Sequence, residues 1–92
     1  MSILNTGGSP KFAQNITLQP GAVTSNVVST QTFTVKGLDP DGLVLINAPS
    51  IETGLFVVNA FVATKNVLTL QFWNTTGSTI TPASQRFSIY QP

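Results

Sequence analysis

The chain has 92 residues, of which 41% are hydrophobic and 8% are charged, with a formal net charge of +1 and neither cysteine nor histidine. This length allows one small domain with a single core, and the charge is far below the roughly 25% of an average soluble protein. We therefore expect no nucleic-acid partner, because no basic surface is available for a phosphate backbone, and a neutral polar surface that favours association.

The first 21 residues mix turn-forming and isolated apolar residues. TGGSP and QPG surround a short NITLQ, so we expect an extended arm over 1–21 with at most one strand, at 15–19, followed by a folded domain over 22–92. A solvent-exposed tail would rarely carry four apolar side chains, so we predict that these four dock on a neighbouring subunit or another protein: Ile3, Leu4, Phe12 and Ile16.

The start of the chain has no basic stretch followed by an apolar run, as a signal peptide would. No segment reaches the about 20 apolar residues that span a bilayer. We expect synthesis in a cytoplasm and no membrane partner.

The middle of the chain predicts two strands and a turn. TQTFTVKGL alternates with period two and turns Phe33 and Val35 inward. DPDG, at 39–42, has Asp, Pro and Gly in turn positions, and LVLINAP starts the next strand. Its run 43–46 is apolar throughout, which indicates a strand covered on both faces.

A hairpin follows, with strands over 55–64 and 67–74 and a bend at Lys65-Asn66. Alternation places Phe61 opposite the other apolar residues of the first strand, and Trp73 opposite those of the second. The inward residues are Phe56, Val58, Ala60, Val62, Leu68, Leu70 and Phe72. QRFSIYQ closes the chain with Phe87 and Ile89 inward and Tyr90 outward. With no helical pattern, the sequence predicts an all-β fold: a small antiparallel β-sandwich or open barrel with an extended N-terminal arm.

Few residues could carry chemistry. Without histidine or cysteine, a hydroxyl nucleophile would need Lys36 or Lys65 as its base, and both are expected at strand ends or turns. We expect no enzyme activity and no cofactor. Asp39 and Asp41 could offer oxygens to Ca²⁺ with Glu52 nearby, but the same residues form a ready-made turn, which we favour over a metal site. Asn15 and Asn74 begin glycosylation-type triplets, which have meaning only in a secreted eukaryotic protein.

The outward aromatic residues allow two interpretations. Trp73 and Tyr90 could stack together on a sugar ring, as in carbohydrate-binding modules. We favour the alternative, in which they are buried at a subunit contact or cover the barrel end, because interface cores are enriched in both residue types. Phe61 makes its strand apolar on both sides, which predicts burial against a second surface beyond the domain's own core.

The run from Thr30 to Tyr90 resembles small head decoration (cement) proteins of tailed bacteriophages, including cyanophages. A Thr-rich strand ends in V-x-G-L, an apolar strand ends in Asn and Pro, a loop closes with GL, a hairpin ends in F-x-N-T-T, and P-A precedes the last strand. The matching positions are Val35, Gly37, Leu38, Asn47, Pro49, Gly54, Leu55, Phe72, Asn74, Thr75, Thr76, Pro82 and Ala83.

The resemblance implies a β-sandwich on the outside of a phage capsid, often a trimer, that clamps adjacent major capsid proteins. It would be located on the virion surface after assembly in the host cytoplasm. On this hypothesis the arm residues and Phe61, Trp73 and Tyr90 contact the capsid or another subunit. The alternatives are a tail- or fibre-associated virion module, or a carbohydrate-binding module that uses Trp73 and Tyr90.

Overall fold

A computed structural model describes residues 11–40 and 42–92 of the chain. Within these two ranges the chain is all-β and contains no helix. Its six strands are β1 (Phe12–Leu18), β2 (Val28–Thr34), β3 (Leu45–Asn47), β4 (Leu55–Thr64), β5 (Val67–Asn74) and β6 (Gln85–Gln91). The described part of the chain therefore has no helix of the length and apolarity that cross a membrane.

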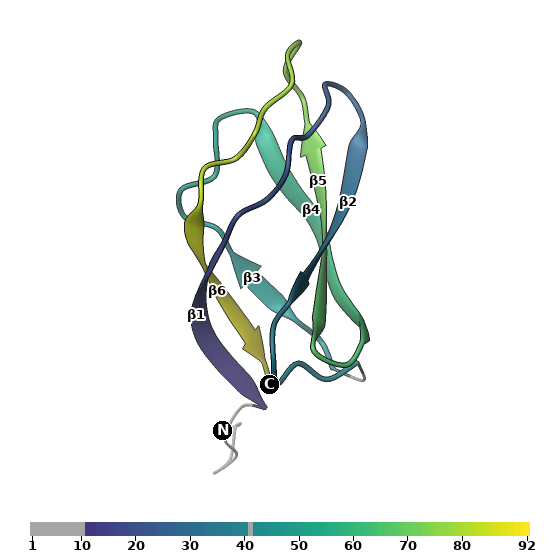
Figure 1. Ribbon diagram of the computed structural model, residues 1–92, viewed down its shortest axis with the longest axis vertical. Coiled ribbons are helices and arrows are strands. Elements are labelled where there is room, and N and C mark those ends of the chain that lie inside the picture. The colour runs from purple at the N-terminus through teal and green to yellow at the C-terminus, as the bar shows by residue number, and fades with distance from the viewer. Residues whose placement is uncertain (1–10, 41) are drawn as a thin grey trace, which may run out of the picture.

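The strands form two three-stranded antiparallel sheets, in the orders β1-β6-β3 and β2-β5-β4. The sheets pack face to face as a small sandwich, and the chain passes between them four times (Figure 1). The fold predicted from the period-two pattern is thus confirmed. The alternation of burial is regular in β6, the central strand of its sheet, and in β2, whose residues are exposed and half-buried in turn.

The core lies between the two sheets and draws on both. β5 contributes Leu68, Leu70 and Phe72, and β6 contributes Phe87 and Ile89, all of them almost fully buried. These five residues were expected to point inward, because they alternate with polar or outward residues in the sequence. Burying large apolar side chains in this way supplies most of the favourable free energy of such a small domain.

The hairpin of β4 and β5 turns at Lys65-Asn66, as expected. Asn66 has φ of 67°, a conformation that asparagine tolerates better than most residues. Its backbone and side chain also bond the preceding turn, since Asn66 Oδ1 accepts from Gly37 N at 2.8 Å and Asn66 N donates to Leu38 O at 3.0 Å. The turns at this end of the sandwich therefore hold one another.

The N-terminal part of the sandwich differs from the expected arm. Residues 12–18 pair with β6 along their whole length, and the buried ring of Phe12 packs against the backbone of Gly37. An added Cβ on Gly37 would lie 3.2 Å from the Phe12 ring, which shows how closely the two pack. This part of the expected arm is a strand of the sandwich, because its apolar side chains are needed to close the core.

β3 also differs from expectation. The apolar run at 43–46 was predicted to be covered on both faces, yet Leu43 and Leu45 are 64% and 51% exposed. The strand is short and forms the edge of its sheet, with Val44 and Ile46 toward the core. Its outer face therefore lacks a cover within the described chain.

Candidate functional site

The outer face of the β2-β5-β4 sheet carries a row of three large apolar side chains. Val28 pairs with Trp73 on one side, and Phe56 pairs with Trp73 on the other. The three are 55%, 45% and 52% exposed. Phe61 lies two rows further along, where it pairs with Thr69. We call this surface, defined by Val28, Phe56, Phe61 and Trp73, the Trp73 face; a group of large exposed apolar side chains is typical of an interaction surface.

A β-bulge in β4 brings Phe56 and Phe61 onto the same face. Val57 pairs with Phe72 and Asn59 with Gln71, so Val58 is an extra residue between two pairs. Because of this extra residue, even-numbered residues point outward before the bulge and odd-numbered residues point outward after it. The predicted grouping of Phe56 with Val62 on the inner face is therefore wrong: Val62 is buried, whereas Phe56 is exposed.

A row of polar side chains follows the apolar row. Thr30, Gln71 and Asn59 are paired across the sheet, and hydrogen bonds join them side by side. Asn59 Nδ2 donates to Gln71 Oε1 at 3.1 Å, and Gln71 Nε2 donates to Thr30 Oγ1 at 3.2 Å. These residues carry no charge. The two hydrogen bonds restrict the rotamers of the three side chains, so the polar part of the Trp73 face is preorganised.

Asn74 anchors the end of β5 next to Trp73. Its side chain is fully buried, and all of its hydrogen-bonding groups are used. Nδ2 donates to Val23 O at 3.0 Å and to Ser78 O at 2.7 Å, while Oδ1 accepts from Thr76 N at 2.9 Å and Thr76 Oγ1 at 2.7 Å. The triplet at Asn74 is therefore a structural element of the fold, and its amide faces the interior rather than the solvent.

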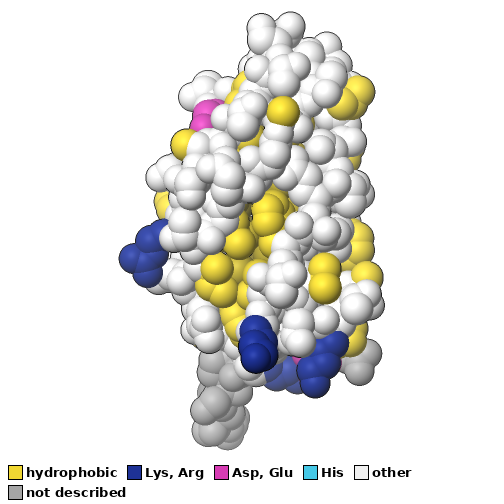
Figure 2. All heavy atoms as spheres, in the orientation of Figure 1, with side chains coloured by type: hydrophobic (Ala, Val, Ile, Leu, Met, Phe, Trp, Pro, Cys, Tyr) yellow, Lys and Arg dark blue, Asp and Glu magenta, His cyan; other side chains and the backbone are white. Residues whose placement is uncertain are grey.

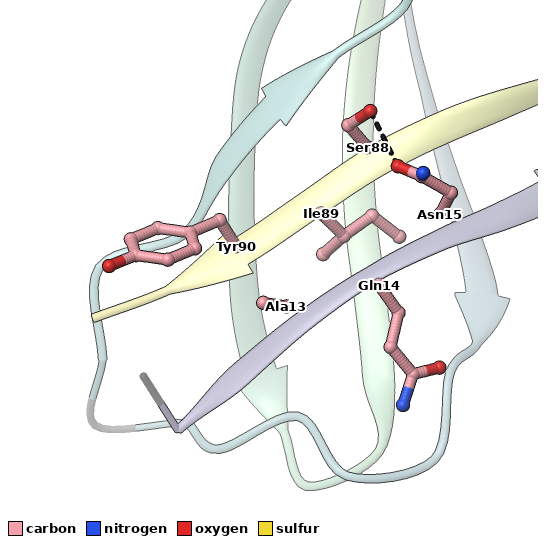
Figure 3. A pocket seen from close by; sticks show the side chains of 6 residues that line it. All are labelled: Ala13, Gln14, Asn15, Ser88, Ile89 and Tyr90. Atoms are coloured by element: carbon pink, nitrogen blue, oxygen red, sulfur yellow. Dashed lines mark hydrogen bonds between the residues drawn. The ribbon is translucent and has the colours of Figure 1, made fainter. Parts of the chain in front are cut away.

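The outer face of the β1-β6-β3 sheet repeats this arrangement with smaller residues. Its apolar row consists of Ala13, Tyr90 and Leu45, and the next row consists of Asn15, Ser88 and Asn47. Tyr90 is 41% exposed, and Ala13 leaves the position beside it almost empty. The result is a shallow hollow of about 340 Å³, lined by Ala13, Gln14, Asn15, Ser88, Ile89 and Tyr90 (Figure 3). We call it the Tyr90 hollow.

The two aromatic residues that the sequence suggested as a joint sugar platform lie on opposite sides of the molecule. Trp73 is on the outer face of one sheet and Tyr90 on the outer face of the other, with the shared core between them. They cannot stack on the same ring. Any sugar site must therefore use one of them alone with its own neighbours.

The four apolar residues of the expected arm have different fates. Phe12 belongs to the core and Ile16 packs against it, so neither is available as a docking side chain in the way that was predicted. Ile3 and Leu4 lie outside the described residues. Sequence reasoning missed Val28 and Phe56 as outward residues; the one available signal was Asn59, since asparagine is disfavoured within strands and marks the irregularity.

The acidic turn is used for structure. Gln91 Oε1 accepts from Asp39 N, and Gln91 Nε2 donates to Asp39 O, each at 2.9 Å, so the buried amide of Gln91 pairs with this backbone as a strand would. The Asp39 carboxylate lies 3.9 Å from Lys11 Nζ. Asp41 lies outside the described residues, and Glu52 instead accepts from Ala83 N at 2.8 Å. Among residues 11–40 and 42–92 no three acidic, His or Cys side chains gather as a metal site would require.

The surface in the view of Figure 2 is dominated by uncharged polar atoms. Lysine and arginine side chains lie near the lower end and at one edge, and few acidic atoms are visible, most of them near the upper left. Hydrophobic side chains run along the middle of this view. The surface agrees with the composition: association would depend on apolar contact and neutral hydrogen bonds rather than on charge.

Comparisons with protein-family models, with curated proteins and with solved structures found no match to this chain.

Proposed function

We propose that the protein is a virion structural protein, a capsid decoration or cement protein that binds the outside of a phage head through the Trp73 face. The observation that carries the proposal is the paired row of Val28, Trp73 and Phe56, exposed on an uncharged sheet face. Apolar, aromatic surfaces of this kind are typical of the centre of a protein–protein interface. The sequence resemblance supplies the partner, the major capsid protein, and favours a trimer.

The mechanism follows from where the contact area is formed. A sheet face that bridges two neighbouring capsid proteins is buried only when both are in the arrangement of the mature shell. Binding to that arrangement and not to others stabilises it by mass action. Trp73 is the expected centre of the contact, because tryptophan is among the residues whose truncation costs interfaces most.

The test is binding of the purified chain to heads that lack it, from the phage whose genome encodes it. Sedimentation and electron microscopy would measure occupancy, and thermal melting would measure the stability of the shell. We expect the wild-type chain to bind and to raise the melting temperature. The double variant F56S/W73S should bind at least about 30-fold more weakly, the effect of losing about 2 kcal/mol at a hot spot.

A matched control changes the same number of exposed apolar residues on the opposite face. L45S/Y90S should keep the affinity of the wild type, because Leu45 and Tyr90 lie on the outer side of the other sheet. Undiminished binding by F56S/W73S would contradict the role of the Trp73 face. Location of the chain on the tail or fibres of purified virions would contradict the decoration function itself.

The N-terminal residues are a second proposed contact. Ile3 and Leu4 remain candidates for docking on the capsid or on another subunit, whereas Phe12 does not, because it is part of the core. A truncation that tests this must stop before β1, since removal of residues 12–18 would take a strand out of the sandwich. Deletion of residues 1–10 should weaken head binding and leave the unfolding transition unchanged; full-strength binding would exclude a role for this segment.

A further inference from the structure

We propose that the Tyr90 hollow is a binding subsite for the ring of a neutral saccharide. The inference is independent of the Trp73 face and goes beyond a structural role in a virion. It rests on the arrangement of four outward side chains in two adjacent pairs: Ala13 with Tyr90, and Asn15 with Ser88. In Figure 3 the Tyr90 ring and the Asn15–Ser88 pair lie on either side of Ala13.

The hollow exists because one position of the apolar row is occupied by alanine. On the opposite sheet the corresponding row has a large side chain on each side of its central aromatic residue, Val28 and Phe56 around Trp73. Here Tyr90 has Leu45 on one side and only the methyl group of Ala13 on the other. The space of about 340 Å³ falls at the lower end of the range of ligand sites, about 300–1,000 Å³.

The polar wall of the hollow is held in place by a hydrogen bond. Ser88 Oγ donates to Asn15 Oδ1 at 2.7 Å, which fixes the orientation of the Asn15 amide. Within the described chain neither the Asn15 Nδ2 hydrogens nor the lone pairs of Ser88 Oγ bond another residue. The wall therefore offers two amide donors and a hydroxyl acceptor close together, the combination that binds the vicinal hydroxyl groups of a sugar ring.

The aromatic wall suits the other side of the same ligand. The exposed Tyr90 ring can stack on the apolar C–H face of a pyranose, and its phenol group can exchange hydrogen bonds with a ring substituent. The six lining residues contain no carboxylate, amine or guanidinium. Arg86 pairs with Thr17 one row beyond the polar wall and does not line the hollow. The geometry thus points to an uncharged sugar.

The experiment uses the full chain and protein-observed NMR, with glucose, galactose, mannose and N-acetylglucosamine as separate probes at concentrations up to several times the Kd. An open site with one stacking ring should bind with a Kd of about 1 mM, equivalent to about 4 kcal/mol. At least one probe should shift the Asn15 side-chain amide resonances and the Tyr90 ring resonances together. Resonances of Trp73, on the opposite face, should not move.

Filling the hollow provides the decisive variant. A13L places a larger side chain where the ligand would lie and leaves Tyr90, Asn15 and Ser88 in place; Ala13 is exposed on an edge strand, so the fold should tolerate it. Binding should weaken at least about 10-fold. The control is T17L on the same strand and the same outer face but outside the hollow, which should bind as the wild type does. A second variant, N15D, replaces both amide donors with a carboxylate and should also weaken binding.

Three results would overturn the proposal. One is the absence of any shift with all four sugars, and another is unchanged binding by A13L. The third is binding of glucuronic acid, used as a fifth probe, without binding of any neutral sugar and abolished by R86Q, which would move the site to the Arg86 row. Head binding by the Trp73 face has a different readout and different variants. Failure of that function would therefore leave the sugar site standing, and failure of the sugar site would leave the decoration function standing.

Discussion

The two outer faces of the sandwich share one plan and differ in the size of a few side chains. Each has an apolar row with an aromatic residue on the central strand, followed by a polar row that contains asparagine. On the Trp73 face the aromatic residue has large neighbours on both sides. Next to Tyr90 one neighbour is alanine, and a hollow takes the place of a continuous apolar surface.

This difference separates two kinds of recognition. A continuous row of Val28, Trp73 and Phe56 can bury a broad area against a partner, which is how a protein surface is bound. A hollow with one aromatic and one polar wall surrounds a small ligand instead. The same sheet geometry can therefore present a protein-docking face and a ligand subsite on opposite sides of a single small domain.

The largest expected change in the free energy of unfolding comes from deleting one residue from an edge strand, and we compare β1 of one sheet with β4 of the other. Deletion of Asn15 from β1 moves residues on one side of it to the other face, so Phe12 or Leu18 would leave the core, at a cost of about 3–5 kcal/mol. Deletion of Val58 from β4 removes only the bulge, and Phe56 and Phe61 should stay outside at a cost of about 1 kcal/mol. Urea unfolding measures both. Equal losses would show that the Trp73 face depends on the bulge as much as the Tyr90 face depends on its register.

The next effect concerns the buried anchor of the Trp73 face. N74A removes four hydrogen bonds at a fully buried position, so Val23 O keeps only Ile80 N as a donor and Thr76 N loses its acceptor. We expect a loss of about 2–4 kcal/mol in the free energy of unfolding. N47A, an exposed asparagine in the polar row of the other face, should change it by less than about 0.5 kcal/mol. A loss from N74A no larger than that from N47A would contradict the anchoring role.

A smaller effect is expected from the polar rows. Q71A breaks both bonds of the ladder on the Trp73 face, and S88A breaks the single bond of the pair beside the Tyr90 hollow. The partners of these groups can bond to water once the hydrogen bonds are broken. We therefore expect the free energy of unfolding to fall by about 0.5–1 kcal/mol for Q71A and by at most about 0.5 kcal/mol for S88A. Thermal unfolding of the two variants would measure both losses. A larger loss for S88A than for Q71A would show that the Asn15–Ser88 bond contributes more to stability than the ladder does.

A comparably small effect on stability is expected from the side chains proposed to matter most for binding. V28T, F56T and W73T combined should change the free energy of unfolding by less than about 1 kcal/mol, because all three are about half exposed in the isolated chain. The same variant should precipitate at a higher ammonium sulfate concentration than the wild type. L45T/Y90T should shift that concentration less. A larger shift from L45T/Y90T would make the Tyr90 side the more adhesive of the two faces.

Much of the fold follows from local patterns. Alternation in 67–74 and 85–91 indicated which residues of the two central strands build the core, and the Lys65-Asn66 bend was expected from the tolerance of asparagine for positive φ. The inward residues of the central strands can be predicted from the sequence because each strand has a neighbour on both sides and one face toward the core. The structure of the edge strands is predicted less accurately, because each has only one neighbouring strand to fix its alternation.

The errors of sequence reasoning fall on those edges. The arm over 1–21 was predicted to hold at most one strand, at 15–19; β1 instead begins at Phe12 and pairs with β6 along its whole length, so it completes a sheet. The run 43–46, which enters β3, is apolar throughout but covered on one side only. In β4 the extra residue Val58, at the first of two register shifts, reverses the phase of the alternation, so Phe56 points outward instead of inward. Each error concerns which neighbour a strand has, and neighbours in a sheet can lie far apart in the chain.

The amino-acid sequence by itself determined the all-β class, the hairpin, the inward residues of the central strands and the nearly uncharged surface, because these depend on periodicity, turn chemistry and composition. The tertiary structure decided how the outward residues are grouped. Strand pairing brought Val28, Trp73 and Phe56 into one row and placed Ala13 beside Tyr90, and it put the two aromatic residues on opposite sides of the core. Register between strands is a long-range property, and both proposed sites are products of register.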